Sequence, residues 1–146
     1  METKFNKNFY HERQVETWKR FWEFYGTLVS QNEKSGKAKG LRFESDFVVD
    51  LSCSFPLMEQ LDCTYIWVEV VRNSPMTPEK KKWLLKMLSE KWLILECGYG
   101  KTFEVHRPDA YMEREKRKMT AEDIEKILHS LLQQKAKLRQ RLIAPK

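Results

Sequence analysis

Apolar and polar side chains alternate most clearly between Phe43 and Phe55. The odd positions are mostly apolar, and the even positions include three acids. Because successive side chains of a strand point to opposite faces, this pattern predicts one long strand with a core face and an acidic face in water. A strand of this length is unusual, so a bulge or bend is predicted near Ser45.

Three further strands are predicted. Thr64–Arg72 is β-branched and aromatic on both faces except at Glu69, which is typical of an interior strand. The short link before it predicts antiparallel pairing with the first strand. Trp92–Cys97 and Thr102–His106 predict a hairpin that turns at Gly98–Lys101. A carboxylate such as that of Glu69 is costly to bury, so we expect either a lysine or arginine partner for it or an edge position that faces solvent.

Three helices are predicted around these strands. Residues 8–31 carry apolar side chains at spacings of three and four, and Thr77 followed by Pro78 and Glu79 opens a second helix. Thr120 is expected to cap the third. The element order is α-β-β-α-β-β-α, or α-β-β-β-α-β-β-α if the long strand is divided. The prediction is an α+β fold with an antiparallel sheet of four or five strands packed by three helices.

Composition narrows the class of protein. The 146 residues are 41% hydrophobic and 33% charged, which suits one globular domain over 1–146. No apolar run approaches the roughly 20 residues of a membrane span, and the first residues lack a signal-peptide core. We therefore expect an intracellular protein, cytoplasmic or nuclear, with no membrane contact. The end from about 135 is basic and is expected to fray.

The first predicted helix offers a candidate surface for a protein partner. An aromatic stripe of this kind is most often part of a core, but one such helix can carry more apolar area than a single sheet covers. As a binding surface it would serve a partner protein or a homodimer. The candidate residues are Trp18, Phe21, Trp22 and Tyr25.

Basic side chains give a second candidate surface. The net charge of +6 is a moderate excess that suits an anionic partner without identifying one. Acidic side chains lie among the basic ones and weaken the positive potential, and no nucleic-acid motif is present. Nucleic acid is therefore the alternative partner. The candidate anion-binding residues are Lys80, Lys81, Lys82, Lys86, Lys135, Lys137, Arg139 and Arg141.

Catalytic and metal signatures are weak. Three cysteines at no metal-like spacing are predicted to be small buried residues of a reducing compartment. The three histidines have no histidine or cysteine partner at a spacing of three or four residues, so neither a metal site nor a cofactor is predicted. Asp50 and Glu69 on neighbouring strands resemble the metal-binding carboxylates of PD-(D/E)XK nucleases. The lysine expected two residues after the glutamate is replaced by Val71, so a metal-dependent nuclease is the weakest alternative.

The order of elements itself resembles two groups of binding proteins at the level of topology. One is the small dimeric secretion-chaperone fold, and the other is the roadblock/longin-like family of adaptor domains. Both resemblances imply a binding role. The prediction is a small non-enzymatic adaptor that recognises another protein, alone or as a homodimer.

Overall fold

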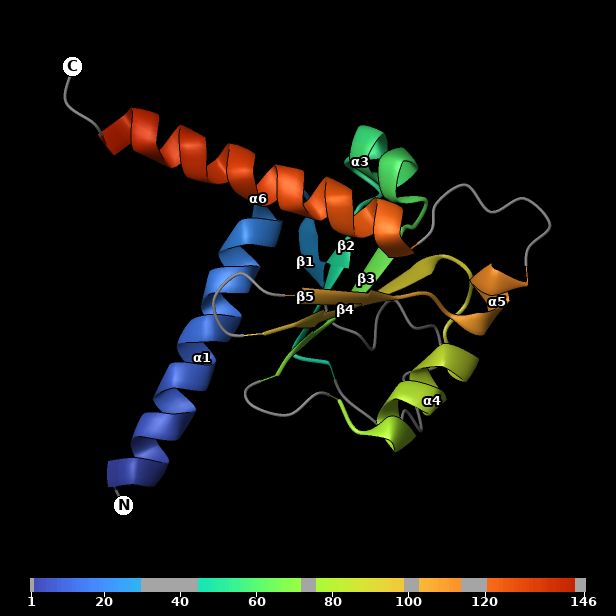
Figure 1. Ribbon diagram of the computed structural model, residues 1–146, viewed down its shortest axis with the longest axis horizontal. Coiled ribbons are helices and arrows are strands. Elements are labelled where there is room, and N and C mark those ends of the chain that lie inside the picture. The colour runs from blue at the N-terminus through green and yellow to red at the C-terminus, as the bar shows by residue number, and fades with distance from the viewer. Residues whose placement is uncertain (1, 30–44, 72–75, 99–102, 114–120, 144–146) are drawn as a thin grey trace.

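A five-stranded sheet forms the centre of the protein (Figure 1). The computed structural model describes residues 2–29, 45–71, 76–98, 103–113 and 121–143, with side chains described between Tyr10 and Gln134. The strands lie side by side in chain order. They are β1 (Thr27–Val29), β2 (Phe47–Asp50), β3 (Tyr65–Val70), β4 (Trp92–Cys97) and β5 (Phe103–His106).

Five helices occur in the described part of the chain, two more than predicted. None of them is long and apolar enough to span a membrane. Helices α6 and α4 lie on opposite sides of the sheet (Figure 1). The helices are α1 (Glu2–Glu23), α3 (Phe55–Leu61), α4 (Pro78–Met87), α5 (Asp109–Met112) and α6 (Ala121–Ile143).

The sheet is mixed, which corrects the prediction of an antiparallel sheet. β2–β3 and β4–β5 are antiparallel pairs, as expected. β1, which lies within the range predicted to be a helix, is antiparallel to β2. β3 and β4 are parallel, with Glu69 opposite Glu96. The reason is α4, which follows β3 and returns the chain to the end of the sheet where β3 began. The cap of α4 is as predicted, because the Thr77 hydroxyl accepts a hydrogen bond from the Lys80 amide at 3.3 Å.

The remaining differences concern where elements end. The helix predicted over 8–31 ends at Glu23, where the amides of Tyr25 and Gly26 both donate to the Trp22 carbonyl at 2.9 and 2.8 Å. The chain then enters β1. Of the long strand predicted over 43–55, the described part (45–55) contains one strand, β2, and α3 begins at Phe55. Residues 30–44 lie outside those described.

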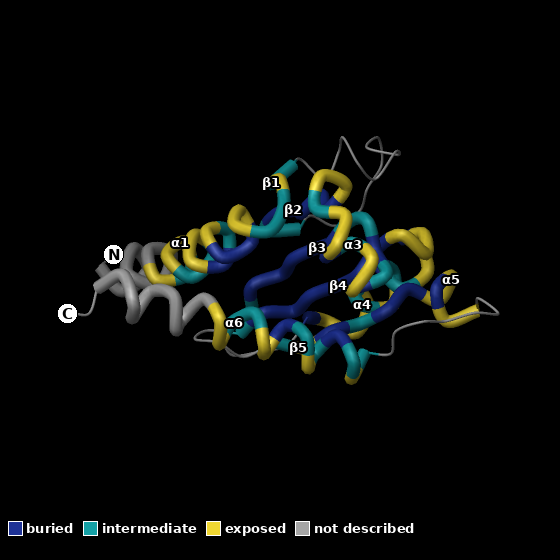
Figure 2. The backbone as a smooth tube through the Cα atoms, turned by 90° about the horizontal axis from the view of Figure 1, so that it is seen from above, coloured by how far each residue is buried: buried dark blue, intermediate teal, exposed yellow. Residues whose placement is uncertain are grey.

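Buried side chains pack on both faces of the sheet. The larger core lies between the sheet and α1, α3 and α6, and the smaller one lies beneath α4. Figure 2 shows that the buried residues concentrate in the central strands. Because α4 covers the second face, β2 is buried on both sides, and the solvated acidic face predicted for it is wrong. Asp50 is itself buried and accepts hydrogen bonds from the Ser52 amide and hydroxyl.

A buried arginine joins α3 to the chain after β5. The Arg107 guanidinium donates to the carbonyls of Leu61 and Asp62 at 2.5 and 3.0 Å, which lie at the C-terminal end of α3. It also lies over the Tyr111 ring of α5, 3.9 Å from the ring centre. The Tyr111 hydroxyl in turn donates to the Asp62 carboxylate at 2.8 Å. These contacts hold α3, β5 and α5 together.

Gly26 is placed where no side chain fits. An added Cβ would lie 2.8 Å from Val49 Cγ1, 2.9 Å from the Asp50 carbonyl oxygen and 3.0 Å from Leu51 Cδ2. We expect Gly26→Ala to lower the free energy of unfolding by about 1–3 kcal/mol. The reason is that the crowded atoms belong to the backbone of β2 and to the buried side chains of Val49 and Leu51. Urea unfolding followed by tryptophan fluorescence measures this change. An unaltered midpoint would show that β1 shifts freely away from β2.

Candidate functional site

The aromatic stripe of α1 is part of the core. Trp18, Phe21 and Trp22 are buried, and their rings pack against each other and against the sheet. Tyr25 is half-buried, and burial raises the pKa of its hydroxyl. The protein's own sheet therefore occupies the face that these residues were expected to offer a partner. Binding through them stays a prediction that this packing does not favour.

Exposed aromatic side chains lie instead at the end of the same helix. Phe24 directly follows α1 and is 65% exposed, and Phe55 at the start of α3 is 61% exposed. The two segments are connected, because the Ser54 hydroxyl donates to the Tyr25 carbonyl. Phe24 and Phe55 are each one residue from this hydrogen bond, and we call the pair the aromatic corner.

The basic helix is less uniform than its sequence indicates. Lys82 and Lys86 are exposed and Lys81 is half-buried. Lys80 instead points to the sheet and pairs with Glu69, which corrects its assignment to a free basic surface. The remaining predicted cations lie on α6, with side chains outside those described: Lys135, Lys137, Arg139 and Arg141.

Glu69 has the basic partner that its burial predicted. Its carboxylate lies 2.5 Å from the Lys80 ammonium and accepts a hydrogen bond from the Trp67 indole at 3.1 Å. The two side chains of the ion pair are only 11% and 18% exposed. Burial raises the pKa of Glu69, and the hydrogen bond and charge of Lys80 oppose that rise. The contact is a structural ion pair between β3 and α4.

The carboxylates proposed for a nuclease do not meet. In the β2–β3 pair, Asp50 lies opposite Tyr65 at the beginning of β3, whereas Glu69 lies near the end of β3. Asp50 is held by Ser52, and Glu69 by Lys80. The two acids therefore cannot share a metal ion, and the nuclease alternative loses the pair on which it was based.

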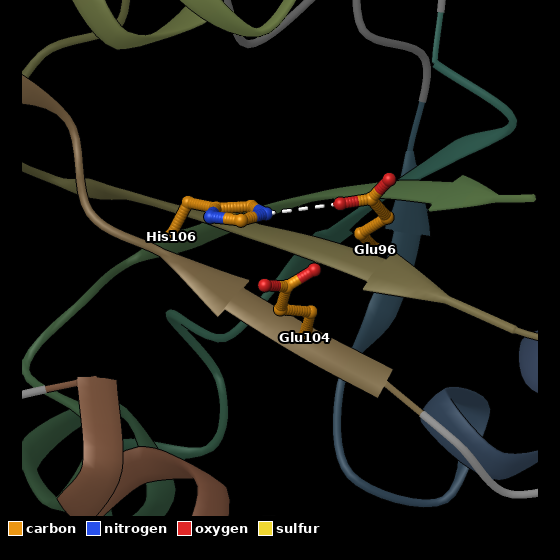
Figure 3. Close-up of side chains that lie close together, drawn as sticks. All are labelled: Glu96, Glu104 and His106. Atoms are coloured by element: carbon orange, nitrogen blue, oxygen red, sulfur yellow. Dashed lines mark hydrogen bonds and ion pairs between the residues drawn. The ribbon is translucent and has the colours of Figure 1, made fainter. Parts of the chain in front are cut away.

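A different group of polar side chains comes together on β4 and β5 (Figure 3). Glu96 and Glu104 are direct cross-strand neighbours, and His106 lies opposite Ile94 on the same face. The His106 imidazole Nε2 is 3.0 Å from a Glu96 carboxylate oxygen. The other Glu96 oxygen accepts a hydrogen bond from the Met76 amide. Potential ligand atoms from Glu96, Glu104 and His106 all lie within 4.8 Å of one another.

The sequence prediction missed this group for two reasons. Histidine partners were sought at helical spacings, whereas Glu104 and His106 are two apart on a strand and so share one face. The hairpin was also predicted with Cys97 opposite Thr102, and the structure pairs Cys97 with Phe103. A register error of one residue moves side chains to the other face, which concealed the approach of His106 to Glu96.

The cysteines follow the prediction in part. All three are free thiols, and Cys63 and Cys97 are buried in the core. Burial raises the pKa of Cys63 to about 12 and that of Cys97 well above its usual value. Cys53 was expected on the core face of the long strand, but it is exposed because β2 ends at Asp50.

Comparison with known proteins gives no assignment for these features. No family model, no curated protein and no solved structure matches this chain.

Proposed function

We propose that this chain is a small binding protein that recognises another protein through the aromatic corner. The observation that supports the proposal is the exposure of Phe24 and Phe55 from adjoining segments. Large aromatic side chains are enriched where protein partners bind, because they bury much area at little cost in side-chain entropy. We keep the proposal of partner recognition, and we move its surface from the buried stripe of α1 to Phe24 and Phe55.

The backbone beneath the aromatic corner suits a fixed binding surface. Gly26 packs directly on β2, and the Ser54 hydroxyl ties the start of α3 to the end of α1. The Phe24 ring also packs edge-on against Tyr25, with ring centres 5.0 Å apart. A partner would therefore meet aromatic side chains whose backbone is already ordered, which lowers the entropic cost of association.

The experiment is an affinity capture from lysate with the wild-type chain and with Phe24→Ser/Phe55→Ser as baits. We expect a discrete protein on the wild-type bait that survives nuclease and high salt, with its recovery reduced at least tenfold on the double variant. Met87→Ser is the matched control, because Met87 is also exposed but lies on α4. Equal recovery on the double variant and the wild type would refute the proposal.

Light scattering and the nuclease and salt arms of the capture separate a homodimer and nucleic acid from a different protein partner. Light scattering of the purified chain tests the homodimer, whose mass should fall to that of one chain in the Phe24→Ser/Phe55→Ser variant. Nucleic acid is the alternative that the exposed Lys82 and Lys86 favour. In that case recovery would collapse with nuclease or salt, since phosphate contacts release counterions.

A further inference from the structure

We propose that Glu96, Glu104 and His106 form a binding site for a divalent transition-metal ion, for which Zn²⁺ is the probe. The inference is independent of the proposed partner surface, because the three residues lie on the β4–β5 hairpin beside α4. Two carboxylate oxygens and one imidazole nitrogen form a ligand set that Zn²⁺ accepts in proteins, with a fourth position left for water.

The hairpin register sets the geometry of the three ligands. Glu96 and Glu104 face each other directly, and His106 follows Glu104 by two residues and therefore lies on its face. Figure 3 shows the Glu104 carboxylate beside the contact between His106 and Glu96. Ligands around a tetrahedral Zn²⁺ lie about 3.4 Å apart, and the His106–Glu96 separation of 3.0 Å is close to this. Glu104 is exposed, so its side chain has room to rotate toward the other two ligands, which lie within 4.8 Å.

The charges on this face favour a bound cation. Like charges directly opposite on neighbouring strands repel, and Glu96 is only 4% exposed. Glu69 is the next residue across the sheet, on β3, and its carboxylate is already matched by Lys80. The His106 imidazole contacts Glu96, and a divalent ion between the facing carboxylates of Glu96 and Glu104 would neutralise their negative charge.

The surroundings of Glu96 also suit a ligand. The Met76 amide, just before α4, donates to one of its oxygens and leaves the other directed at His106. Hydrogen bonds of this kind orient metal-binding carboxylates, and their loss typically weakens metal binding about 10- to 100-fold. The same backbone that begins α4 thus holds the most buried ligand in place.

The test is calorimetric titration of the metal-stripped full chain with Zn²⁺, alongside thermal unfolding. We expect one ion per chain, with the melting temperature raised by about 5–10 °C at an ion concentration near 100 times Kd. Glu104→Gln and His106→Gln each remove a direct ligand, so each should weaken binding by more than the roughly 10- to 100-fold that loss of an outer-shell partner costs. Glu104 is exposed, so Glu104→Gln is expected to leave the metal-free melting temperature unchanged.

Two controls distinguish this site from others on the chain. Glu59→Gln removes an exposed carboxylate from α3 and should retain wild-type affinity. Cys53→Ser removes the exposed thiol and should also bind normally, and bound Co²⁺ should show no thiolate charge-transfer band. Wild-type affinity in both Glu104→Gln and His106→Gln, or no Zn²⁺ binding by the unmodified chain, would overturn the proposal and leave Glu96–His106 as a structural contact between β4 and β5.

Discussion

Lys80→Met is expected to lower the free energy of unfolding at neutral pH by about 3–5 kcal/mol. The substitution keeps the length of the side chain but removes the ammonium 2.5 Å from the Glu69 carboxylate. The Trp67 indole remains as a donor, but it carries no charge to offset burial. Most of the loss is therefore the cost of leaving a carboxylate buried without a cation. Chemical denaturation of the variant and the wild type measures the difference.

The loss in Lys80→Met should depend on pH. Burial already raises the pKa of Glu69, and removing Lys80 removes the interactions that oppose the rise. The folded state then binds a proton more readily than the unfolded state, so stability falls as pH rises through the folded-state pKa. We expect the variant to regain stability relative to the wild type as pH falls toward about 4–5, the ordinary glutamate range.

Two comparison variants identify the cause. Lys82→Met changes an exposed lysine of the same helix and should alter stability by less than about 0.5 kcal/mol. Lys80→Met combined with Glu69→Gln removes both charges and should recover most of the loss, with a flat pH dependence. If the double variant is as unstable as Lys80→Met, packing of the lysine stem rather than the buried charge accounts for the effect.

Trp22→Ala is expected to cost about 3–5 kcal/mol of folding free energy. The Trp22 side chain is fully buried in the core between α1 and the sheet, with ring centres 5.2 Å from Phe21 and 6.4 Å from Tyr25. Truncation leaves a cavity between α1 and the sheet, and the strands of the sheet are too rigid to move in and fill it. The loss of stability is read from the midpoint of thermal or urea unfolding.

Trp22→Phe and Phe24→Ala provide the contrast. The Trp22 indole N–H is buried without a hydrogen-bond partner among the described residues, so phenylalanine loses ring volume but also removes an unsatisfied donor. We expect a smaller cost than for alanine. Phe24→Ala, two residues away and exposed, should leave stability within about 0.5 kcal/mol of the wild type. A severe loss in Phe24→Ala would mean that the aromatic corner supports the fold.

Short-range sequence patterns predicted the features that are determined by residues close together in the chain. The Thr77 cap, the β4–β5 hairpin and the interior strand with its buried Glu69 were all expected from spacing and residue type, and the structure contains them. The predicted strand over 43–55 was too long because alternation alone cannot show where pairing stops. Its pattern continues past Asp50, but no β3 residues remain beyond Tyr65 to extend the ladder.

The features that sequence reasoning missed depend on contacts between distant segments. The direction of β4 relative to β3 is set by the path of α4 across the sheet, and no property of either strand reveals it. The exposure of Phe24 and Phe55 depends on how α1 and α3 meet through Ser54. The approach of His106 to Glu96 required the correct register of a hairpin, which residue types alone left uncertain by one position.

The reactivity of the two buried cysteines can be used to measure local unfolding of this protein. Cys63 lies in the link from α3 to β3, and Cys97 ends β4, so the two thiols sample different parts of the core. Their raised pKa values keep both in the unreactive thiol form, whereas Cys53 is exposed. Thiol-reactive labelling therefore proceeds at Cys53 in the native state and elsewhere only through structural fluctuations. Comparing the rates at Cys63 and Cys97 shows whether the α3–β3 junction opens before the central strands separate.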